Sequence, residues 1–282
     1  MTDTVKLPRF GVIAALVADT FQEAMARWLF WGLFGLSTLL ILFFLFILKI
    51  DVVEGAVSLL GLQKTSHSFA DLRRIVHLAY SQVALFLYVW GTFLAVFASA
   101  GLLPGVLEPG RIGLLLSKPI TRPVLLMGRF LGNLLIIAAN IGYLILSIWV
   151  IIGLKTGFWD PAFLLTIPIT VFVFAVLLCV VVFIGVAFES APVAVMVAAA
   201  LMLISGILAQ KDKVVRLLSS EWSRDLWIWL YWASPKVWDL GRAMMNLISD
   251  RSAEWWAPAW TSAVFGIVVL AGAIQIFQKR DY

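Results

Sequence analysis

The sequence is poor in the residues that carry most enzyme chemistry and that cover most soluble proteins. Charged residues fill only 13% of its 282 positions, histidine occurs twice, and the single cysteine, Cys179, lies within a long apolar segment. One cysteine excludes an intrachain disulfide and argues against a cysteine-based metal site. Together with a hydrophobic content of 62%, these scarcities exclude the disordered and the ordinary soluble classes.

Several catalytic motifs are also missing. The chain contains no Gly-Lys pair and therefore no phosphate-binding loop of the kind that cradles a triphosphate. It contains neither a Gly-x-Ser-x-Gly elbow nor a His-Glu-x-x-His pair. We therefore expect no ATP hydrolysis, no catalytic residues and no cofactor in this chain itself.

Long uncharged apolar runs are what the sequence has in abundance. A hydrocarbon core of about 30 Å requires roughly 20 helical residues to cross it. Six runs reach that length, which predicts an all-α integral membrane protein with six transmembrane helices, in a single domain over residues 1–282. The runs are Leu29 to Leu48, Leu78 to Leu103, Phe130 to Leu154, Pro161 to Phe188, Ser190 to Gln210 and Trp255 to Gln278.

An amphipathic helix is expected over residues 1–27, ahead of the first run. Apolar side chains recur there every three or four residues, and polar ones lie between them. Such a helix suits the membrane interface, whereas the alternative is a soluble helix packed on another domain. The apolar positions are Phe10, Ile13, Val17, Phe21, Met25 and Trp28.

The loop at residues 211–254, before the last run, is rich in tryptophan. Eight of the thirteen tryptophans lie between Trp222 and Trp260. Indole rings prefer the headgroup level of a membrane, so we expect short amphipathic helices on one face of the membrane, broken at Ser234 and Pro235. Two interpretations stay open, a lid over a pathway and a plain aromatic belt.

Polar residues within the runs are sparse and uncharged, which gives no case for a proton relay. Asn133, Asn140 and Ser147 recur at seven-residue spacing and share one helix face, where they either line a pathway or hydrogen-bond a neighbouring helix. His67, Asp71 and His77 are close in sequence, but His77 falls off the face shared by the other two. No metal site is expected.

The charge count alone does not determine the orientation of the chain in the membrane. The raw count of Lys and Arg favours neither side, and the net charge of +5 is spread over the loops, unlike that of a nucleic-acid binder. The segment from Arg111 to Arg129, however, carries four bases and no acid, which favours the cytoplasm. We therefore predict an inner-membrane protein with both termini cytoplasmic.

Residues 104–129 are the most specific segment. Four prolines interrupt them, so a short helix from Arg111 to Ser117 is expected to end near Lys118, because Pro119 disfavours helix before it. Lys118 and Arg122 then project as exposed cations.

This segment resembles the permeases of the ABC-2 family, the membrane subunits of a large class of ABC exporters. The family's acid-glycine, Ser-x-Pro-x-x-Arg and Gly-basic-x-x-Gly patterns match Glu108, Gly110, Gly113, Ser117, Pro119, Arg122, Gly128, Arg129 and Gly132. Phe277 to Tyr282 is similar to the family's closing signature, and Asp19 to Ala24 to the pattern of its N-terminal elbow helix.

The resemblance implies a mechanism. Such permeases form dimers, and each permease binds a separate subunit that holds ATP and Mg²⁺ and docks on the cytoplasmic loops. The residues that it assigns to this contact lie in the elbow helix, in the 104–129 segment and in a short turn. They are Glu23, Glu108, Arg111, Ser117, Lys118, Pro119, Arg122, Glu189 and Ser190.

Two other classes of function remain open from the residues alone. A membrane anchor for a soluble partner would use the same basic loop. An intramembrane enzyme would need convergent catalytic groups within the spans, which the sequence does not supply. The cargo is not determined, because an apolar interior suits lipids, hydrophobic drugs, peptides and sugar-linked lipids alike.

Overall fold

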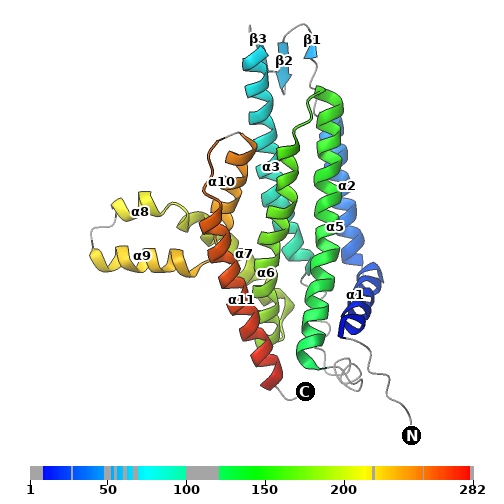
Figure 1. Cartoon of the computed structure of the whole chain (residues 1–282), viewed down its shortest axis with the longest axis vertical. Coiled ribbons are helices and arrows are strands. Elements are labelled where there is room, and N and C mark those ends of the chain that lie inside the picture. Colours follow the sequence, from blue (N-terminus) through cyan, green and yellow to red (C-terminus); the bar gives the residue numbers. More distant parts are fainter. Residues whose placement is uncertain are drawn as a thin grey trace.

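The computed structural model describes nine segments of the chain, and most of their residues are helical, as the predicted all-α membrane fold requires (Figure 1). The described segments are residues 9–26, 28–47, 52–53, 56–59, 62–65, 69–99, 121–217, 220–249 and 251–279.

Six stretches of helix correspond to the six predicted runs. Five are long and apolar enough to cross a membrane, and a sixth crossing arises if α1 and α2, which meet at a bend of 72°, form one broken span. The six are α2 (Trp28–Ile47), α3 (Phe69–Ser99), α5 (Arg122–Thr156), α6 (Thr166–Phe188, preceded by the 3₁₀ turn η2, Pro161–Leu165), α7 (Ala191–Leu208) and α11 (Trp256–Lys279), and α1 (Arg9–Ala26) precedes them.

Two helices begin earlier than the uncharged runs suggested. Helix α3 begins at Phe69 instead of near Leu78, and α5 begins at Arg122 instead of near Phe130. The absence of charge marks the part of a helix that suits hydrocarbon, whereas a helix continues through charged residues that are solvated or paired. Arg129 is such a residue, and its partners are described below.

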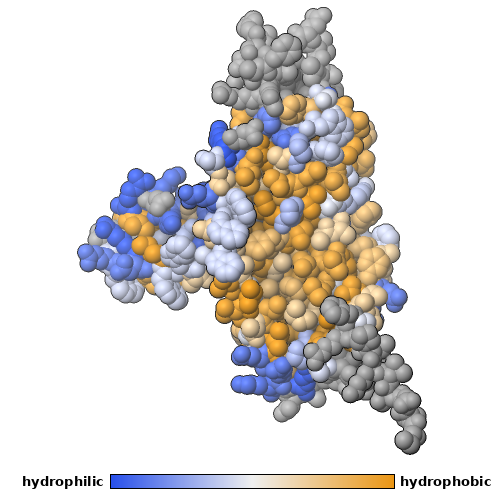
Figure 2. Space-filling model, in the orientation of Figure 1, coloured by the Kyte–Doolittle hydropathy of each residue, from blue (hydrophilic) through white to orange (hydrophobic). Residues whose placement is uncertain are grey.

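Helix α6 forms the centre of the bundle. It contacts α3, α5, α7 and α11, and Val173, Leu177 and Val181 on it are almost fully buried. A helix that is apolar all round is stable only with neighbours on most sides. The outer faces of α2, α3, α7 and α11 instead leave many large apolar side chains exposed, and apolar residues form a band on the face of the bundle that Figure 2 shows.

The tryptophan-rich loop contains three short helices, as predicted. They are α8 (Lys211–Leu217), α9 (Glu221–Ala233) and α10 (Val237–Ile248), and the break between α9 and α10 falls at residues 234–236. Helices α8 and α9 project sideways from the bundle (Figure 1), whereas α10 packs on α3, α6 and α7. No residue of α9 is buried, and Trp222, Trp229 and Trp232 are exposed on it.

A small antiparallel sheet lies beyond the upper end of the bundle, between α2 and α3 in sequence (Figure 1). Its strands are β1 (Val52–Val53), β2 (Ala56–Leu59) and β3 (Leu62–Thr65), in the order β1-β2-β3. Sequence reasoning did not predict them, because this segment is too short to span a membrane and carries little alternation. They add a small sheet to a protein whose other described elements are helices.

The two ends of the bundle differ in which elements they gather. Helix α1, the start of α5, the turn between α6 and α7 and the end of α11 lie at the lower end (Figure 1). The end of α5, the end of α10 and the three strands lie at the upper end (Figure 1). Helix α5, with 35 residues, is about 52 Å long and extends past a hydrocarbon core of about 30 Å.

Candidate functional site

A buried arginine joins the N-terminal helix to the bundle at the lower end. Arg129 on α5 is only 3% exposed, and its Nη1 donates to Glu23 Oε2 at 2.7 Å and to Thr20 Oγ1 at 3.3 Å. Its Nη2 forms a second ion pair with Asp19. Asp19 and Glu23 are four residues apart on α1 and therefore lie on one helix face. This four-residue group, which we call the Arg129 cluster, fixes α1 against α5.

Two glycines that flank Arg129 allow this close approach. A Cβ atom at Gly128 would lie 2.7 Å from Leu16 Cβ, and one at Gly132 would lie 2.7 Å from Thr20 Cβ. Real Cβ atoms do not approach other carbons so closely, so only glycine fits at either position. The Gly-Arg-x-x-Gly pattern therefore has a physical reason: two small residues bring α1 within reach of the arginine between them.

Arg122 contacts the end of the last helix. It is half-buried, and its Nη1 donates to the carbonyl oxygens of Phe277 and Gln278, both at 3.3 Å. These are among the last carbonyls of α11, which lack partners within the helix, and a cation stabilises a helix C-terminus. Arg122 therefore links the beginning of α5 to the end of α11. That it also contacts a partner subunit stays a prediction.

The turn between α6 and α7 is tight. Glu189 ends α6 in the left-handed conformation, with φ 53°, and its N–H donates to Gly185 O at 3.0 Å. Ser190 directly precedes α7, whose second residue is Pro192, and Ser190 O accepts from Ala194 N at 3.1 Å. Two residues thus connect two membrane helices in a short, defined turn at the lower end, and its contact with a partner stays a prediction.

The remaining residues assigned by the family resemblance cannot be placed. Glu108, Arg111, Ser117, Lys118 and Pro119 lie outside the described residues, as does the expected short helix from Arg111 to Ser117. Helix α1, which contains Glu23, and the start of α5, which is Arg122, lie at the lower end of the bundle with the turn between α6 and α7 (Figure 1). Their contact with a partner remains a prediction.

The three polar residues along α5 have different surroundings. Ser37 on α2 donates to Asn140 Oδ1 at 3.0 Å, which is a hydrogen bond to a neighbouring helix. Asn133 is fully buried, and neither of its amide atoms has a partner among the described residues. Ser147 is half-buried. Among the described residues, the small void beside Asn140 holds only about 10 Å³, too little for a pathway in this conformation.

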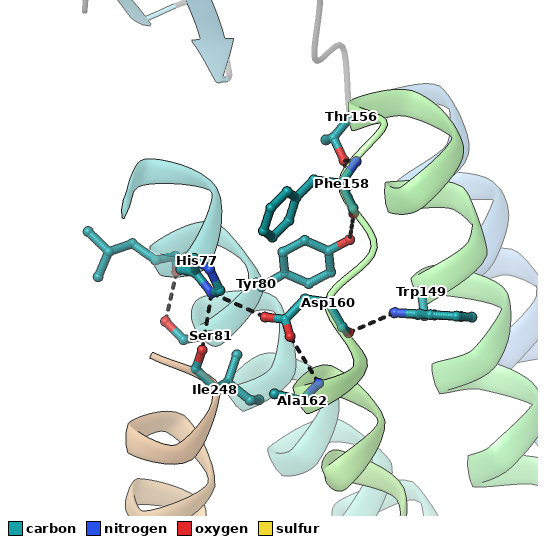
Figure 3. A network of polar contacts seen from close by, with 10 residues as sticks. His77, Tyr80, Ser81, Trp149, Thr156, Phe158, Asp160, Ala162 and Ile248 are labelled. Carbon is teal, nitrogen blue, oxygen red and sulfur yellow. Dashed lines mark hydrogen bonds and ion pairs between the residues drawn. The ribbon is translucent and has the colours of Figure 1, made fainter. Parts of the chain in front are cut away.

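A second polar network lies at the upper end of the bundle (Figure 3). His77 Nδ1 on α3 lies 3.2 Å from Asp160 Oδ2 and 3.3 Å from the carbonyl of Ile248 at the end of α10. Asp160 also caps the turn η2, because its Oδ1 accepts from Ala162 N at 2.9 Å. Trp149 Nε1 on α5 donates to Asp160 O at 2.9 Å. Asp160 therefore connects α3, α5 and η2 at one point.

The described residues place no metal site around His77. His67 lies outside the described residues, and no group of three potential metal ligands occurs in the part of the chain that the structure describes. The partner of His77 is Asp160, which is 83 positions away in sequence and lies close only because α3 packs beside η2.

Sequence reasoning missed the pairing of Arg129 with Asp19 and Glu23. Arg129 stood out as part of a basic loop and of the family's Gly-basic-x-x-Gly pattern, and Asp19 only as part of the resemblance. A stronger signal was present: two acids four residues apart on an amphipathic helix, and an arginine between glycines at the start of a span. A charge there requires a partner, because an unpaired charge at such a position is costly.

The bundle of membrane-length helices, its apolar band and the paired charges at one end define a multi-pass membrane protein. The chain belongs to the ABC-2 family, since the model of the ABC-2 family transporter protein matches residues 14–282. The chain is therefore a permease of an ABC-type transporter, whose family implies a partner ATP-binding subunit. Among curated proteins, no sequence matches the chain.

Proposed function

We propose that the chain is one permease of a dimeric ABC exporter in the inner membrane, and that the lower end of the bundle faces the cytoplasm. A separate subunit there hydrolyses ATP and docks on the elbow helix, on the segment at residues 104–129 and on the turn at residues 189–190. The chain contributes the pathway, and the partner contributes the energy.

The Arg129 cluster is the observation that supports this proposal most directly. A force on α1 is transmitted to α5 through two ion pairs and through glycine contacts that leave no free space. Arg122 extends the same connection from α5 to α11. Because packed helices move as rigid bodies between alternative packings, a shift of the docking surface is expected to move α1 and α5 together.

Helices α8 and α9, which project from the bundle (Figure 1), are called the arm, and the orientation is tested by labelling a cysteine on it. Ser220 is exposed at the start of α9, and Cys179, the one native cysteine, can be replaced by alanine. A Ser220→Cys variant in a Cys179→Ala background is expected to react with a membrane-impermeant thiol reagent added to intact cells. The Cys179→Ala protein without Ser220→Cys is the control. Labelling that appears only after lysis would place the arm inside and contradict the proposed docking side.

The transporter and the passive anchor are distinguished by how the spans respond to nucleotide. In a complex of the chain with its ATP-binding subunit, ATP plus vanadate is expected to change hydrogen exchange in peptides from α1, α5 and the α6–α7 turn. The control is a complex whose ATP-binding subunit lacks its phosphate-loop lysine. Exchange that is the same with and without nucleotide would show a passive anchor, because an anchor holds its partner without changing conformation.

A further inference from the structure

A polar pocket of about 390 Å³ lies where the arm meets the bundle. Residues of α8, α9, α10 and the start of α11 surround it, so four elements from different parts of the loop converge there. Its ionisable lining consists of Lys211, Tyr231, Lys236, Asp239, Arg242 and Glu254. None of these residues belongs to the Arg129 cluster or to the predicted docking surface.

Lys236 is the unusual member of this lining. Only 3% of it is exposed, and its Nζ lies 3.5 Å from the centroid of the Tyr231 ring and 3.4 Å from the carbonyl oxygen of Ser234. Among the described residues, no carboxylate forms an ion pair with it. Burial of an ammonium without a counter-charge costs several kcal/mol, so such groups are normally paired. The side chain lines a cavity large enough to hold a counter-charge.

The neighbouring charges leave an excess of positive charge. Lys211 places its Nζ 4.4 Å from the centroid of the same Tyr231 ring. Asp239 accepts a hydrogen bond from Tyr231 Oη at 2.9 Å, and Arg242 Nη1 donates to the carbonyl of Ala209 at 3.5 Å. With Glu254, the lining holds three cations and two carboxylates. One negative charge would balance it.

The proton affinity of Lys236 reflects the same arrangement. Burial, followed by the repulsion of Lys211, lowers the pKa of Lys236 to about 8, and the attraction of Asp239 offsets only part of this. The other charged or titratable groups that line the pocket are Tyr231 on α9, Arg242 on α10 and Glu254 before α11. An anion beside Nζ would favour the charged ammonium and raise this pKa again.

The surroundings of the pocket indicate where such an anion comes from. Trp232 lines the pocket and is also exposed on α9, as are Trp222 and Trp229. Exposed indole rings on a projecting amphipathic helix are typical of the membrane interface, at the level of the headgroups. Because Trp232 belongs to the lining, the pocket lies beside one of these exposed rings.

We propose that this pocket is a binding site for the phosphate group of a phospholipid headgroup, held by Lys236 and Lys211. Arg242 lies within the same lining and adds a third cation. The proposal stands apart from the ATPase coupling and concerns binding alone, so it can fail or succeed whatever the chain transports.

Binding of two probes tests the site and the source of the phosphate. The purified full chain is titrated with dioleoyl phosphatidylglycerol, followed by native mass spectrometry, and with the soluble headgroup glycerophosphoglycerol, followed by calorimetry. Dioleoylglycerol, which has no phosphate, reports non-specific acyl-chain binding. Lys236→Gln and Lys211→Gln are each expected to weaken phosphatidylglycerol binding by about tenfold, the effect of one charge-assisted hydrogen bond.

Lys213→Gln is the matched control, because Lys213 is exposed on α8 and lies outside the pocket. The melting temperature of each variant checks that it folds, and Lys236→Met provides a second variant that keeps the apolar stem. If the lysine variants bind only phosphatidylglycerol more weakly than the wild type does, the site recognises a headgroup that carries its acyl chains. If they bind both phosphatidylglycerol and glycerophosphoglycerol more weakly, the site recognises the phosphate itself. Wild-type affinity of the Lys236 and Lys211 variants for both probes would overturn the proposal.

A pH series distinguishes two causes of weaker lipid binding in the Lys236 variant, the lost charge of the ammonium and a disturbed pocket structure. Phosphatidylglycerol keeps its charge from about pH 7 to about pH 9.5, so Lys236 is the group expected to titrate in this range. Lys236 in the empty pocket loses its proton near pH 8, whereas Lys236 beside a bound anion loses it at a higher pH. The affinity of the wild-type chain for the lipid should therefore fall as the pH rises through about 8. Lys236→Gln should abolish this fall. A fall that persists in Lys236→Gln would assign it to another group and contradict the proposed contact.

Discussion

Replacement of Arg129 by methionine is expected to destabilise the chain by about 3 kcal/mol. The substitution keeps the apolar stem but removes both ion pairs, and the Glu23 carboxylate, whose side chain is only 9% exposed, loses its contact with the Arg129 guanidinium. Asp19 is largely exposed and should lose little. Thermal unfolding of the detergent-solubilised chain measures the effect.

Lys213→Met is the control for this substitution, because it removes a cation from an exposed helix position and should change stability by less than about 0.5 kcal/mol. The decisive measurement adds Glu23→Gln to Arg129→Met. If the loss comes from the charge of the Glu23 carboxylate once its contact with Arg129 is removed, the double variant should be more stable than Arg129→Met alone. Strictly additive losses would show that the two side chains do not interact as the structure indicates.

Gly132→Ala is expected to destabilise the packing of α1 on α5 by about 2 kcal/mol. The new methyl group would lie 2.7 Å from Thr20 Cβ, and Thr20 has little room to move because it is buried and its hydroxyl donates to Leu16 O at 2.7 Å. The two helices must therefore separate, which also lengthens the ion pairs of Arg129.

Gly142→Ala is the matched control, since it lies on the same helix and a Cβ there meets no atom within 4 Å. Alanine is the better helix former by about 1 kcal/mol, so this substitution should be neutral or stabilising. The two variants differ only in their surroundings, and their unfolding temperatures are compared side by side. Equal effects of the two substitutions would mean that α1 does not pack closely on α5 in solution.

These two expectations bear directly on coupling. Under the proposed function, α1 moves α5 only while the Arg129 cluster and the glycine contacts hold them together. Gly132→Ala should therefore reduce the nucleotide-dependent change in hydrogen exchange in α5 more than it reduces binding of the ATP-binding subunit. If the contact between α1 and α5 transmits the motion, a variant that weakens it should still bind the ATP-binding subunit but should respond less to nucleotide.

The amount of the fold that follows from sequence depends on the length of each pattern. A run of 20 uncharged residues has few alternatives to a membrane helix, so the spans were predictable. The break at residues 234–236 and the short helices before α11 were predictable from a proline and from the clustered tryptophans. The strands at residues 52–65 were not, because short apolar stretches suit several structures equally well.

The sequence by itself determined the class of protein, because the cost of exposing backbone and charge to hydrocarbon acts on each segment separately. Only the tertiary structure decided which distant residues meet. Arg129 finds Asp19 and Glu23 more than 100 positions away, His77 pairs with Asp160, and Lys236 lies in a pocket shared by four elements. Such contacts arise from how helices pack, and packing depends on surface shapes that no local pattern encodes.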